Sequence, residues 1–489
     1  MPLPAGPKLP GTAQTLLWVT RPLSFMNECR RRYGDVFTVR FTGLGPARDL
    51  VFLADPRAVR AVFAGDPATL HAGSGNAPLE PLLGEHSVLM LDGAEHMRQR
   101  KLLLPPLHGE RMQAYEAVMR DVALAHLERW PAHEEFAVLP EMQSITLQVI
   151  LRTVFGFDDD ASGQRMRDVL RTMLGFGSSR VQLLAFAFAR FELGGHGPWG
   201  AFLKARREVD AALFEQIRTR RGDLDTTSRE DVLSLLLRAR DEEGRAMSDS
   251  ELRDELLTLL VAGHETTATA LAWTLDLLLH HPTLLGRLVR DVEAGETALL
   301  DATIKESLRI RPVVPIVVRQ LQEPFTVLDH ELPKGAIVAP CIYLTQRRAD
   351  VYPHPTRFRP DRFLEGAPDP YAWLPFGGGV RRCLGASFAT FEMRTVLRTI
   401  LSSVELRAAS PALERVTRRA VTLVPKRGTR VVCVRRRDPA APPRRTTSRA
   451  RTRTPAAAVA TPGNGHEVSA AARTSARSPS APRRTPERS

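Results

Sequence analysis

A glycine-rich loop that carries one cysteine, Phe376–Gly385 (FGGGVRRCLG), holds the residues best suited to chemistry in this sequence. Its cysteine, Cys383, comes just before a helical pattern that runs from Ser387 to Ile400. The unpaired amide groups and the positive dipole end of a helix start favour a thiolate, which is the form that binds a metal. The glycines let the backbone lie against a flat group, and Arg381 supplies a cation for an anionic edge. A planar, anionic, iron-bearing ligand fits these features, so the loop predicts haem held by a cysteine thiolate.

The same ten residues resemble the haem-binding signature of the cytochrome P450 monooxygenases, with Cys383 at the position of the axial iron ligand. A single cysteine is more often a small buried apolar residue, and we interpret Cys29, Cys341 and Cys433 in that way. The resemblance implies haem contacts for three further residues of the loop: Phe376, Arg381 and Gly385.

A second motif, Ala262-Gly263-His264-Glu265-Thr266-Thr267, interrupts a long apolar helix pattern. Glycine and paired threonines are poor helix formers, and such local breaks tend to mark functional sites. Thr266 can hydrogen-bond to the carbonyl of residue 262 and bend the helix. Small side chains at Ala262 and Gly263 would leave a groove for dioxygen, and a hydroxyl beside the Glu265 carboxylate makes a short proton relay. The segment resembles the family's oxygen-activating motif, which implies catalytic roles for Thr266 and Glu265 and haem contacts for Ala262 and Gly263.

Two further segments supply cations and apolar residues for the same site. His96 and Arg100 share one helical face at i and i+4, and this pair resembles the family's propionate-binding helix. The extended segment Arg311–Arg319 contains two prolines and resembles the strand that passes beside the haem. It implies a propionate contact for Arg319, and substrate contacts for Val313, Val314 and Val317.

A Glu-x-x-Arg motif predicts a structural network. Glu306 and Arg309 lie at i and i+3, a spacing that usually gives a surface ion pair of little value. In the family this pair is completed by an arginine of a later loop, which the resemblance places at Arg362. Asp361 stands where the family pattern usually has Glu. We expect this triad to hold the cysteine loop and to take no part in chemistry.

The elements that must carry these groups are predicted from local signals. Ser248-Asp249-Ser250-Glu251 is a capping box, and the helix that follows runs to His280-His281, where Pro282 ends it. At about 1.5 Å per residue it spans roughly 45 Å, and its apolar middle predicts burial. Further helices are predicted over 12–33, 110–130, 141–156, 161–176 and 199–221.

The segment Phe176–Phe191 and the helix after it resemble the family's roof over the substrate channel, which moves as a lid. This makes Phe176 a candidate substrate contact, although these phenylalanines are equally consistent with ordinary core packing. Residues 71–93 are predicted to form a loop that could cover a pocket. Strands are predicted over 36–40 and 50–53, in a hairpin of 325–328 with 336–344, and in a last hairpin of 420–424 with 429–434.

The resemblance covers roughly residues 5–437 and implies a mainly α-helical fold with a smaller β region. In that fold the haem lies between the oxygen-activating helix and the helix that follows Cys383. We therefore divide the chain into a haem domain over 1–437 and a tail over 438–489. The tail has ten arginines against three acids and few large apolar residues, so it carries much of the net charge of +13 and is predicted to be disordered. A solvated tail is the simplest interpretation, with nucleic-acid contact as an alternative.

The predicted function is haem-thiolate monooxygenation of an apolar molecule such as a fatty acid, terpenoid, steroid or polyketide-like compound, with O2 and two electrons. The chain after residue 437 is too short for a flavin or iron–sulfur domain, so a separate ferredoxin with its reductase, or a flavodoxin, is expected to supply the electrons. A non-catalytic haem-thiolate sensor and a peroxide-driven oxygenase stay open as alternatives. Unpaired cysteines and the lack of a transmembrane run or signal peptide predict a soluble, cytoplasmic, bacterial-type enzyme.

Overall fold

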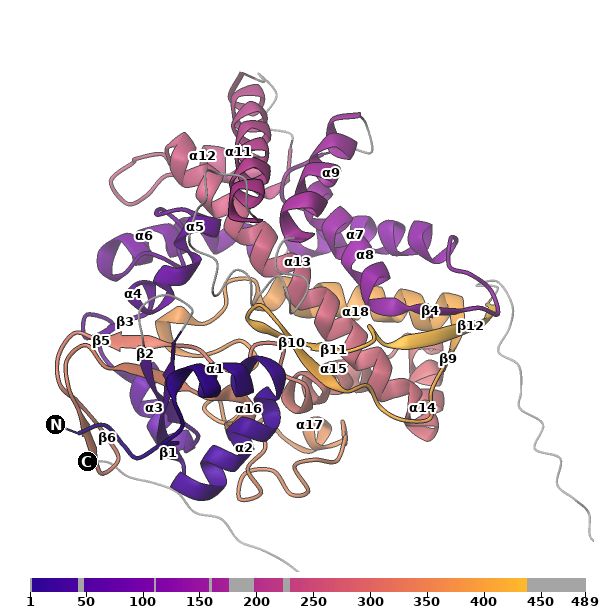
Figure 1. Cartoon of the computed structure of the whole chain (residues 1–489). Helices are drawn as coiled ribbons and strands as arrows, with labels where there is room; N and C mark the ends of the chain where they lie inside the picture. The colour runs from indigo at the N-terminus through magenta and orange to yellow at the C-terminus, as the bar shows by residue number, and fades with distance from the viewer. Residues whose placement is uncertain are drawn as a thin grey trace, which may run out of the picture. The chain divides into compact units, whose positions relative to one another are not determined.

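The computed structural model describes residues 2–42, 48–109, 111–157, 161–175, 198–222 and 229–437. These residues belong to one compact unit, Met1–Ala441. Figure 1 shows a large helical region together with a smaller β region, as predicted. The predicted lid segment Phe176–Phe191, with the candidate substrate contact Phe176, and the tail 438–489 lie outside the described residues.

The longest described helix, α13 (Asp249–Leu279), runs through the helical region (Figure 1). It begins at the predicted capping box, in which the Ser248 hydroxyl accepts from the Glu251 amide at 3.2 Å and the Glu251 carboxylate accepts from the Ser248 amide at 2.7 Å. It ends three residues before Pro282, where the sequence predicted its end. Most of its side chains are buried, because other helices pack on several of its sides.

The helices around α13 bury one continuous apolar core. Helix α8 packs along it, and α18, which follows the cysteine loop, packs against both α13 and α7. The main helices of this region are α7 (Arg111–Leu127), α8 (Val138–Thr153), α9 (Ala161–Gly175), α11 (Pro198–Gly222), α12 (Val232–Arg238), α14 (Pro282–Glu293), α15 (Ala298–Ile310) and α18 (Ala386–Ser403). None of the described helices is long and apolar enough to cross a membrane.

The β region is built on a five-stranded sheet in the order β1-β2-β8-β5-β3. Strand β2 pairs antiparallel with β1 and parallel with β8. Apolar clusters lie against this sheet, and helices α1, α2 and α3 contribute to them. The bounds of these elements are α1 (Gly11–Thr20), α2 (Pro22–Tyr33), β1 (Val36–Phe41), β2 (Arg48–Leu53), α3 (Pro56–Ala64), β3 (Leu70–His71), β5 (Arg319–Leu321) and β8 (Ile337–Pro340).

Both predicted hairpins have the wrong partners. Strand β6 (Phe325–Val327) pairs with β7 (His330–Leu332) through a two-residue turn, whereas β8 pairs with β2 and β5 of the large sheet. Likewise, β11 (Thr422–Pro425) pairs with the strand before it, β10 (Val416–Arg419). Strand β12 (Arg430–Arg436) pairs with β9 (Val404–Ala408) and β4 (Glu135–Ala137). In each case a tight turn selects the nearest strand, and the later strand joins a sheet built from distant segments.

Residues 71–93, predicted to be a loop, contain short helices. These are α4 (Ala72–Asn76), η1 (Ala77–Leu79) and α5 (Glu80–Leu83). The Asp92 carboxylate accepts hydrogen bonds of 2.9–3.1 Å from the amides of Ala72, Gly73 and Ser74, and so closes the segment on itself. The segment continues into α6 (Gly93–Leu103), the predicted propionate helix.

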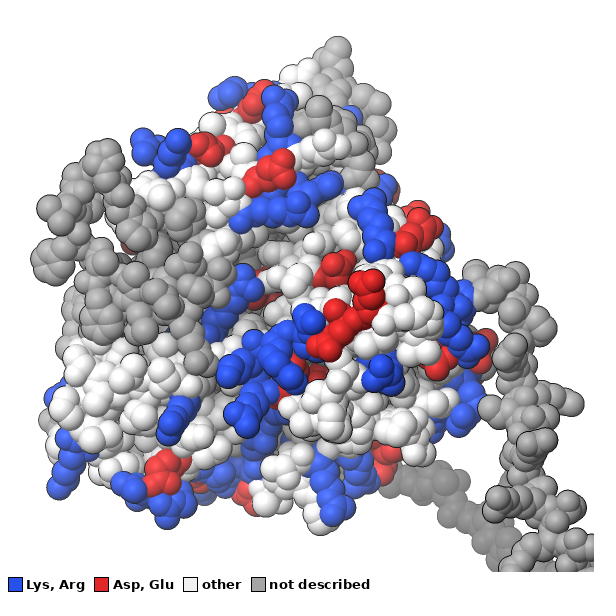
Figure 2. Space-filling model, turned by 45° about the vertical axis from the view of Figure 1, so that its right-hand side comes forward, with Lys and Arg blue, Asp and Glu red and all other residues white. Residues whose placement is uncertain are grey.

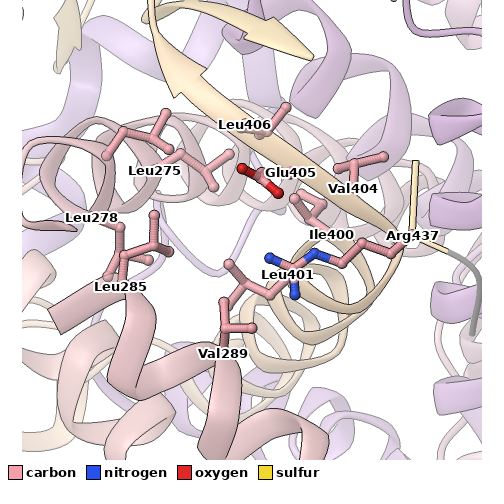
Figure 3. A pocket seen from close by; sticks show the side chains of 11 residues that line it. Leu275, Leu278, Leu285, Val289, Ile400, Leu401, Val404, Glu405, Leu406 and Arg437 are labelled. Carbon is pink, nitrogen blue, oxygen red and sulfur yellow. The ribbon is translucent and has the colours of Figure 1, made fainter. Parts of the chain in front are cut away.

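A small apolar cavity of about 30 Å³ lies between the end of α13, α14 and α18 (Figure 3). Leucines of α13, such as Leu275 and Leu278, line it together with Ile400 and Leu401 of α18, while Arg437 and Glu405 lie beside them. Such a volume holds roughly two water molecules, so this cavity is a packing defect and is too small for an organic substrate.

Candidate active site

The cysteine loop is held in a tight shape before α18 begins. The Cys383 amide donates to the carbonyl of Phe376 at 2.9 Å, which closes the loop. Gly379 has a φ of 65°, and a Cβ on it would lie 2.1 Å from the carbonyl oxygen of Phe63 in α3. A Cβ on Gly378 would lie 2.4 Å from the Phe63 ring. The loop therefore needs glycine at these two positions because its backbone lies directly against α3.

The side chain of Cys383 is exposed, whereas Cys29, Cys341 and Cys433 are buried. Burial nevertheless raises the pKa of the Cys383 thiol. The amide of Gly385 and the cations of Arg100 and Arg382 oppose that shift and favour the thiolate. These are the features of a thiol placed for a ligand inside the molecule, because a coordinated metal deprotonates such a thiol.

The space beside the cysteine is suited to a flat group. A Cβ on Gly385 would meet no protein atom within 4 Å, although Gly385 directly precedes α18 and has an ordinary φ of −82°. Glycine is therefore not required there by backbone strain or by a protein neighbour. A planar macrocycle lying on the loop is the ligand that would make use of this open face.

The predicted propionate-binding residues come together from three segments. Arg381 donates to the carbonyls of Val88 (3.2 Å) and Leu91 (2.5 Å) and pairs with Asp92. Arg100 of α6 donates to the carbonyl of Arg382 at 2.8 Å. The pKa of each guanidinium is lowered, chiefly by burial.

Arg319 and His96 complete this group of cationic residues. Burial and the nearby Arg381 lower the pKa of Arg319 to about 10, and burial with Arg381 and Arg100 lowers the pKa of His96 to about 4. His96 is therefore neutral at pH 7, so it would offer a neutral donor to a propionate. Asp92 pairs with Arg381 and acts on Arg319, whereas Arg100 has no acidic partner among the described residues, so positive charge is in excess here and suits the two carboxylates of a haem.

The oxygen-activating motif lies in the middle of α13. Thr266 donates to the carbonyl of Ala262 at 2.5 Å, which is the back-bond that the sequence predicted. Ala262 is exposed on a helix whose other residues are mostly buried, so this part of α13 also borders open space. A Cβ on Gly263 would lie 3.3 Å from the Cδ1 atom of Ile150, so this glycine lets α8 approach α13 closely.

Glu265 is directed away from the Thr266 hydroxyl and is bound by two other segments. Its carboxylate accepts from the Gln143 amide of α8 at 2.6 Å and forms an ion pair with Arg419 of β10 at 3.3 Å. Burial raises the pKa of Glu265, while Arg419 and Gln143 act against that shift. The pair of a hydroxyl and a carboxylate is thus present, but the carboxylate is held by partners that the sequence did not suggest.

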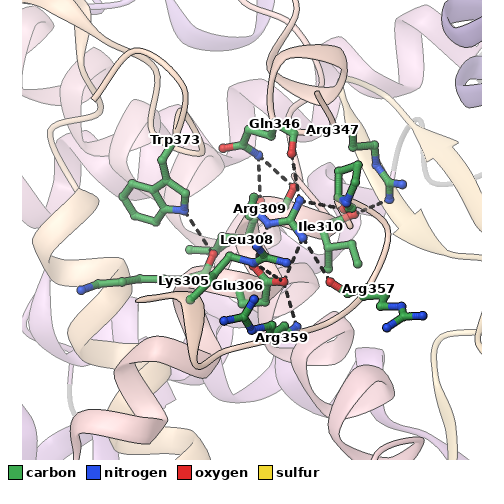
Figure 4. Close-up of polar contacts among 12 residues, drawn as sticks. Lys305, Glu306, Leu308, Arg309, Ile310, Gln346, Arg347, Arg357, Arg359 and Trp373 are labelled. Atoms are coloured by element: carbon green, nitrogen blue, oxygen red, sulfur yellow. Dashed lines mark hydrogen bonds and ion pairs between the residues drawn. The ribbon is translucent and has the colours of Figure 1, made fainter. Parts of the chain in front are cut away.

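The predicted triad forms at the centre of a buried network (Figure 4). Arg309 donates to Glu306 at 2.6 and 2.8 Å, and both side chains are 0% exposed. Arg362 donates to the same carboxylate at 3.1 Å, and the Arg359 amide does so at 2.9 Å. Asp361, the departure from the family pattern, pairs with Arg287 at 2.8 Å on the surface.

Gln346 is a residue of this network that sequence reasoning missed. Its side-chain amide donates to the carbonyls of Leu308 and Arg309 at the end of α15, and its oxygen accepts from the Leu374 amide at 2.7 Å. It therefore joins the triad helix to the segment that leads into the cysteine loop.

The three valines predicted to contact substrate have different surroundings. Val313 is buried in the main helical core, and its carbonyl accepts from the Leu423 amide of β11 at 2.7 Å. Val317 packs against the cluster beside the large sheet. Val314 is half-buried and belongs to neither cluster.

Comparisons with known proteins agree with this geometry. The cytochrome P450 family model matches residues 4–429. Putative cytochrome P450 135B1 of Mycobacterium tuberculosis is 44% identical over 437 residues, which cover 88% of this chain and 91% of that protein. Putative cytochrome P450 137 of the same species is 41% identical over 82% of this chain and 83% of its own.

Solved structures show the same fold. The retinoic acid-bound cyanobacterial CYP120A1 has a TM-score of 0.75 and 26% identity, with coverage of 88% of this chain and 99% of that chain. The heme domain of cytochrome P450DA has a TM-score of 0.76 over 90% of this chain and 98% of its own. At 24% identity the second likeness concerns the fold alone.

Proposed function

The chain belongs to the cytochrome P450 family of haem-thiolate monooxygenases, and we propose that it binds haem through Cys383 and uses O2 to oxidise an apolar small molecule. The observation that supports this assignment is the placement of Cys383, which is exposed at the end of the glycine-rich loop while the other three cysteines are buried. When bound, haem iron supplies the oxygen chemistry, and the thiolate increases the electron density that favours O–O cleavage.

The other residues of the site would orient the cofactor and exclude water. Arg100, Arg319, Arg381 and the neutral His96 would bind the two propionates, because these groups gather with an excess of positive charge. Phe376 and Gly385 would lie against the ring on the cysteine side, and Ala262 and Gly263 of α13 on the other. The network of Glu306, Arg309 and Arg362 would keep the cysteine loop in place.

Proton movement would depend on Thr266 and Glu265. The Thr266 hydroxyl can turn from the Ala262 carbonyl, since a hydroxyl proton rotates freely, and it can then donate to an oxygen ligand. Glu265 would take up a proton from its surroundings, because burial raises its pKa, and would pass it toward the hydroxyl once its bonds to Gln143 and Arg419 open. The Val314 side chain would border the substrate, with Val313 and Val317 behind it.

The thiolate assignment is tested by the absorption of the reduced protein under carbon monoxide. Wild-type protein loaded with haem is expected to show the long-wavelength Soret band that sulfur ligation produces. Cys383→Ala should lose this band, while Cys341→Ala and Cys433→Ala, as matched controls, should keep it. A Cys383→Ala protein that retains the band would contradict the assignment.

The use of O2 is tested by the fate of the electrons. With a surrogate ferredoxin and reductase, Thr266→Ala should divert reducing equivalents from product to hydrogen peroxide, because the hydroxyl proton donor is lost. Equal coupling in the variant and the parent would exclude Thr266 from the proton path, whereas reduction of the parent without any product would favour a sensor without turnover. Turnover that proceeds with added peroxide but not with reduced donor would favour the peroxide-driven alternative.

The electron donor would be a separate acidic protein such as a ferredoxin or flavodoxin. Figure 2 shows Lys and Arg side chains grouped on one face of the molecule with acidic side chains among them. Near the cysteine, Arg382 is exposed, whereas Arg381 is bound to Asp92 and Arg394 pairs with Asp301 at 2.6 Å. Arg382→Glu should therefore slow reduction by such a donor. An unchanged reduction rate would exclude Arg382 from the docking face.

The basic tail 438–489 is not needed in this proposal, which places the haem domain within 1–437 and the reaction in the cytoplasm. A protein truncated after residue 437 should keep both the thiolate spectrum and oxidation. A truncated protein that no longer binds haem would show that the domain boundary is wrong.

A further inference from the structure

Arg418 of β10 is a partly buried cation, and the described part of the chain shows no counter-ion for it. Its Nε donates to the carbonyl of Ala420 at 2.8 Å, while its Nη1 has no hydrogen-bond partner within the part of the chain that the structure describes. Burial lowers its pKa to about 10, and no acidic side chain among the described residues acts against that shift. A buried donor without a partner is costly, so the Nη1 group of Arg418 is a candidate for binding a ligand.

A structural arginine in the same protein has a different environment. Arg309 uses Nε and Nη2 on the Glu306 carboxylate and Nη1 on the carbonyls of Gln346 and Pro355. Its charge and its donors are therefore satisfied by protein groups. The contrast indicates that Arg418 is not held in place simply to support the fold.

A cluster of three aromatic rings, Trp18, Phe41 and Phe52, lies next to Arg418. The guanidinium carbon lies 4.8 Å from the centre of the Trp18 ring of α1. Trp18 in turn packs against Phe41 and Phe52, with ring centres at 5.5 and 5.8 Å. Ile316 and Val318 pack against the same apolar cluster. The cation thus lies over the Trp18 ring at the edge of an apolar region.

The next residue, Arg419, connects the same strand to the proposed oxygen site. Successive side chains of a strand point to opposite faces, and Arg419 reaches Glu265 of α13 at 3.3 Å while Arg418 reaches Trp18. The paired strand β11 binds the carbonyl of Val313 through the Leu423 amide at 2.7 Å. Figure 1 shows β10 and β11 between α1 and α13, which both contact the hairpin.

We propose that Arg418 binds the carboxylate of an amphipathic substrate whose apolar chain lies along the segment 313–318 toward α13. This inference rests on the proposed function and narrows its substrate class to apolar carboxylic acids. A guanidinium binds a carboxylate through two parallel N–H···O bonds, which would satisfy the free Nη1. The haem propionates would bind elsewhere, because the cations proposed for them are Arg100, Arg319 and Arg381, and Arg381 pairs with Asp92.

The test compares a carboxylic acid with its own methyl ester on haem-loaded protein. Binding of myristic acid and of methyl myristate is measured by titration calorimetry, which does not depend on the iron spectrum. The variant is Arg418→Gln, and Arg415→Gln is the matched control, because Arg415 is exposed on the chain just before the same strand. Arg418→Lys keeps a cation but cannot form the bidentate pair with a carboxylate.

Wild type and Arg415→Gln should bind the acid at least tenfold more tightly than the ester. Arg418→Gln should lose that preference through weaker binding of the acid with unchanged binding of the ester, and Arg418→Lys should fall between. Equal affinity of wild type for acid and ester would overturn the proposal, even if Arg418→Gln failed to fold. The carbon monoxide spectrum of wild type is recorded separately, so loss of the thiolate signature would refute the proposed function and not this site.

Discussion

Removing the charge of Glu306 should destabilise the protein strongly, because its carboxylate holds a fully buried arginine. In Glu306→Gln, the Arg309 guanidinium, which is 0% exposed, loses a partner at 2.6–2.8 Å and keeps its charge. Arg362 loses its bond of 3.1 Å to the same group. Breaking a buried ion pair in this way costs about 3–5 kcal/mol.

The expected change in thermal midpoint follows from the size of the domain. A loss of 1 kcal/mol lowers the Tm of a large domain by about 2 °C, so Glu306→Gln should lower it by roughly 5–10 °C. The measurement is the loss of far-ultraviolet circular dichroism on heating at a fixed scan rate. Haem content should fall in parallel, since Gln346 and the Arg359 amide tie the network to the segments around the cysteine loop.

Asp361→Asn is the matched control for this prediction. It removes a carboxylate from the same loop, but Asp361 and its partner Arg287 are 40% and 43% exposed, and such pairs contribute at most about 1 kcal/mol. Its Tm should therefore stay within about 2 °C of the parent value. If Glu306→Gln and Asp361→Asn gave the same small shift, the reasoning that burial makes the triad essential would be refuted.

Three further predictions concern other residues. Glu392 is buried, its Oε1 has no partner in the described structure, and burial raises its pKa to about 8. Above pH 4.5 the unfolded state releases the proton that the folded state still holds. The free energy of unfolding should therefore fall as the pH rises from 4.5 to 8. Glu392→Gln should remove that dependence and add a few kcal/mol at pH 8 in urea unfolding, and an unchanged pH profile would contradict it. Gly379→Ala should abolish haem binding, because its Cβ would lie 2.1 Å from the carbonyl oxygen of Phe63. In the control Gly377→Ala, position 377 has a φ of 66° and no neighbour within 4 Å, so the variant should lose only about 1–2 kcal/mol of folding stability. Equal losses of haem in the two variants would contradict the steric explanation. Gln346→Ala should lower stability by about 1–3 kcal/mol and reduce haem retention during gel filtration, because it leaves a buried backbone amide ahead of the cysteine loop without its acceptor.

The sequence predicted the helices well where the signals were local. The capping box at Ser248 and the proline at 282 marked α13, and the structure places its ends there. The Cys383 loop and the Glu306–Arg309 pair were also found from spacing within a few residues. The family and mainly α fold followed from these motifs, and both are confirmed by the family match and the related structures.

Strand pairing and side-chain partners were not predictable in the same way. The sequence predicted β8 and β12 as strands but assigned them the wrong partners, because each also pairs with a strand hundreds of residues away, β2 and β4 respectively. Gln143 and Arg419 carried no signal as partners of Glu265, and Asp92 carried none as the partner of Arg381.

The amino-acid order by itself determined which residues are capable of the chemistry, since a thiol in a glycine loop and a hydroxyl beside an acid are matters of spacing. Only the folded chain decided which charges are neutralised, because that depends on burial and on partners from other elements. Arg309 and Arg418 are both arginines in the sequence, yet the first is bound by a carboxylate and several carbonyls. The second has a donor that finds no partner among the described residues, and it lies against the Trp18 ring.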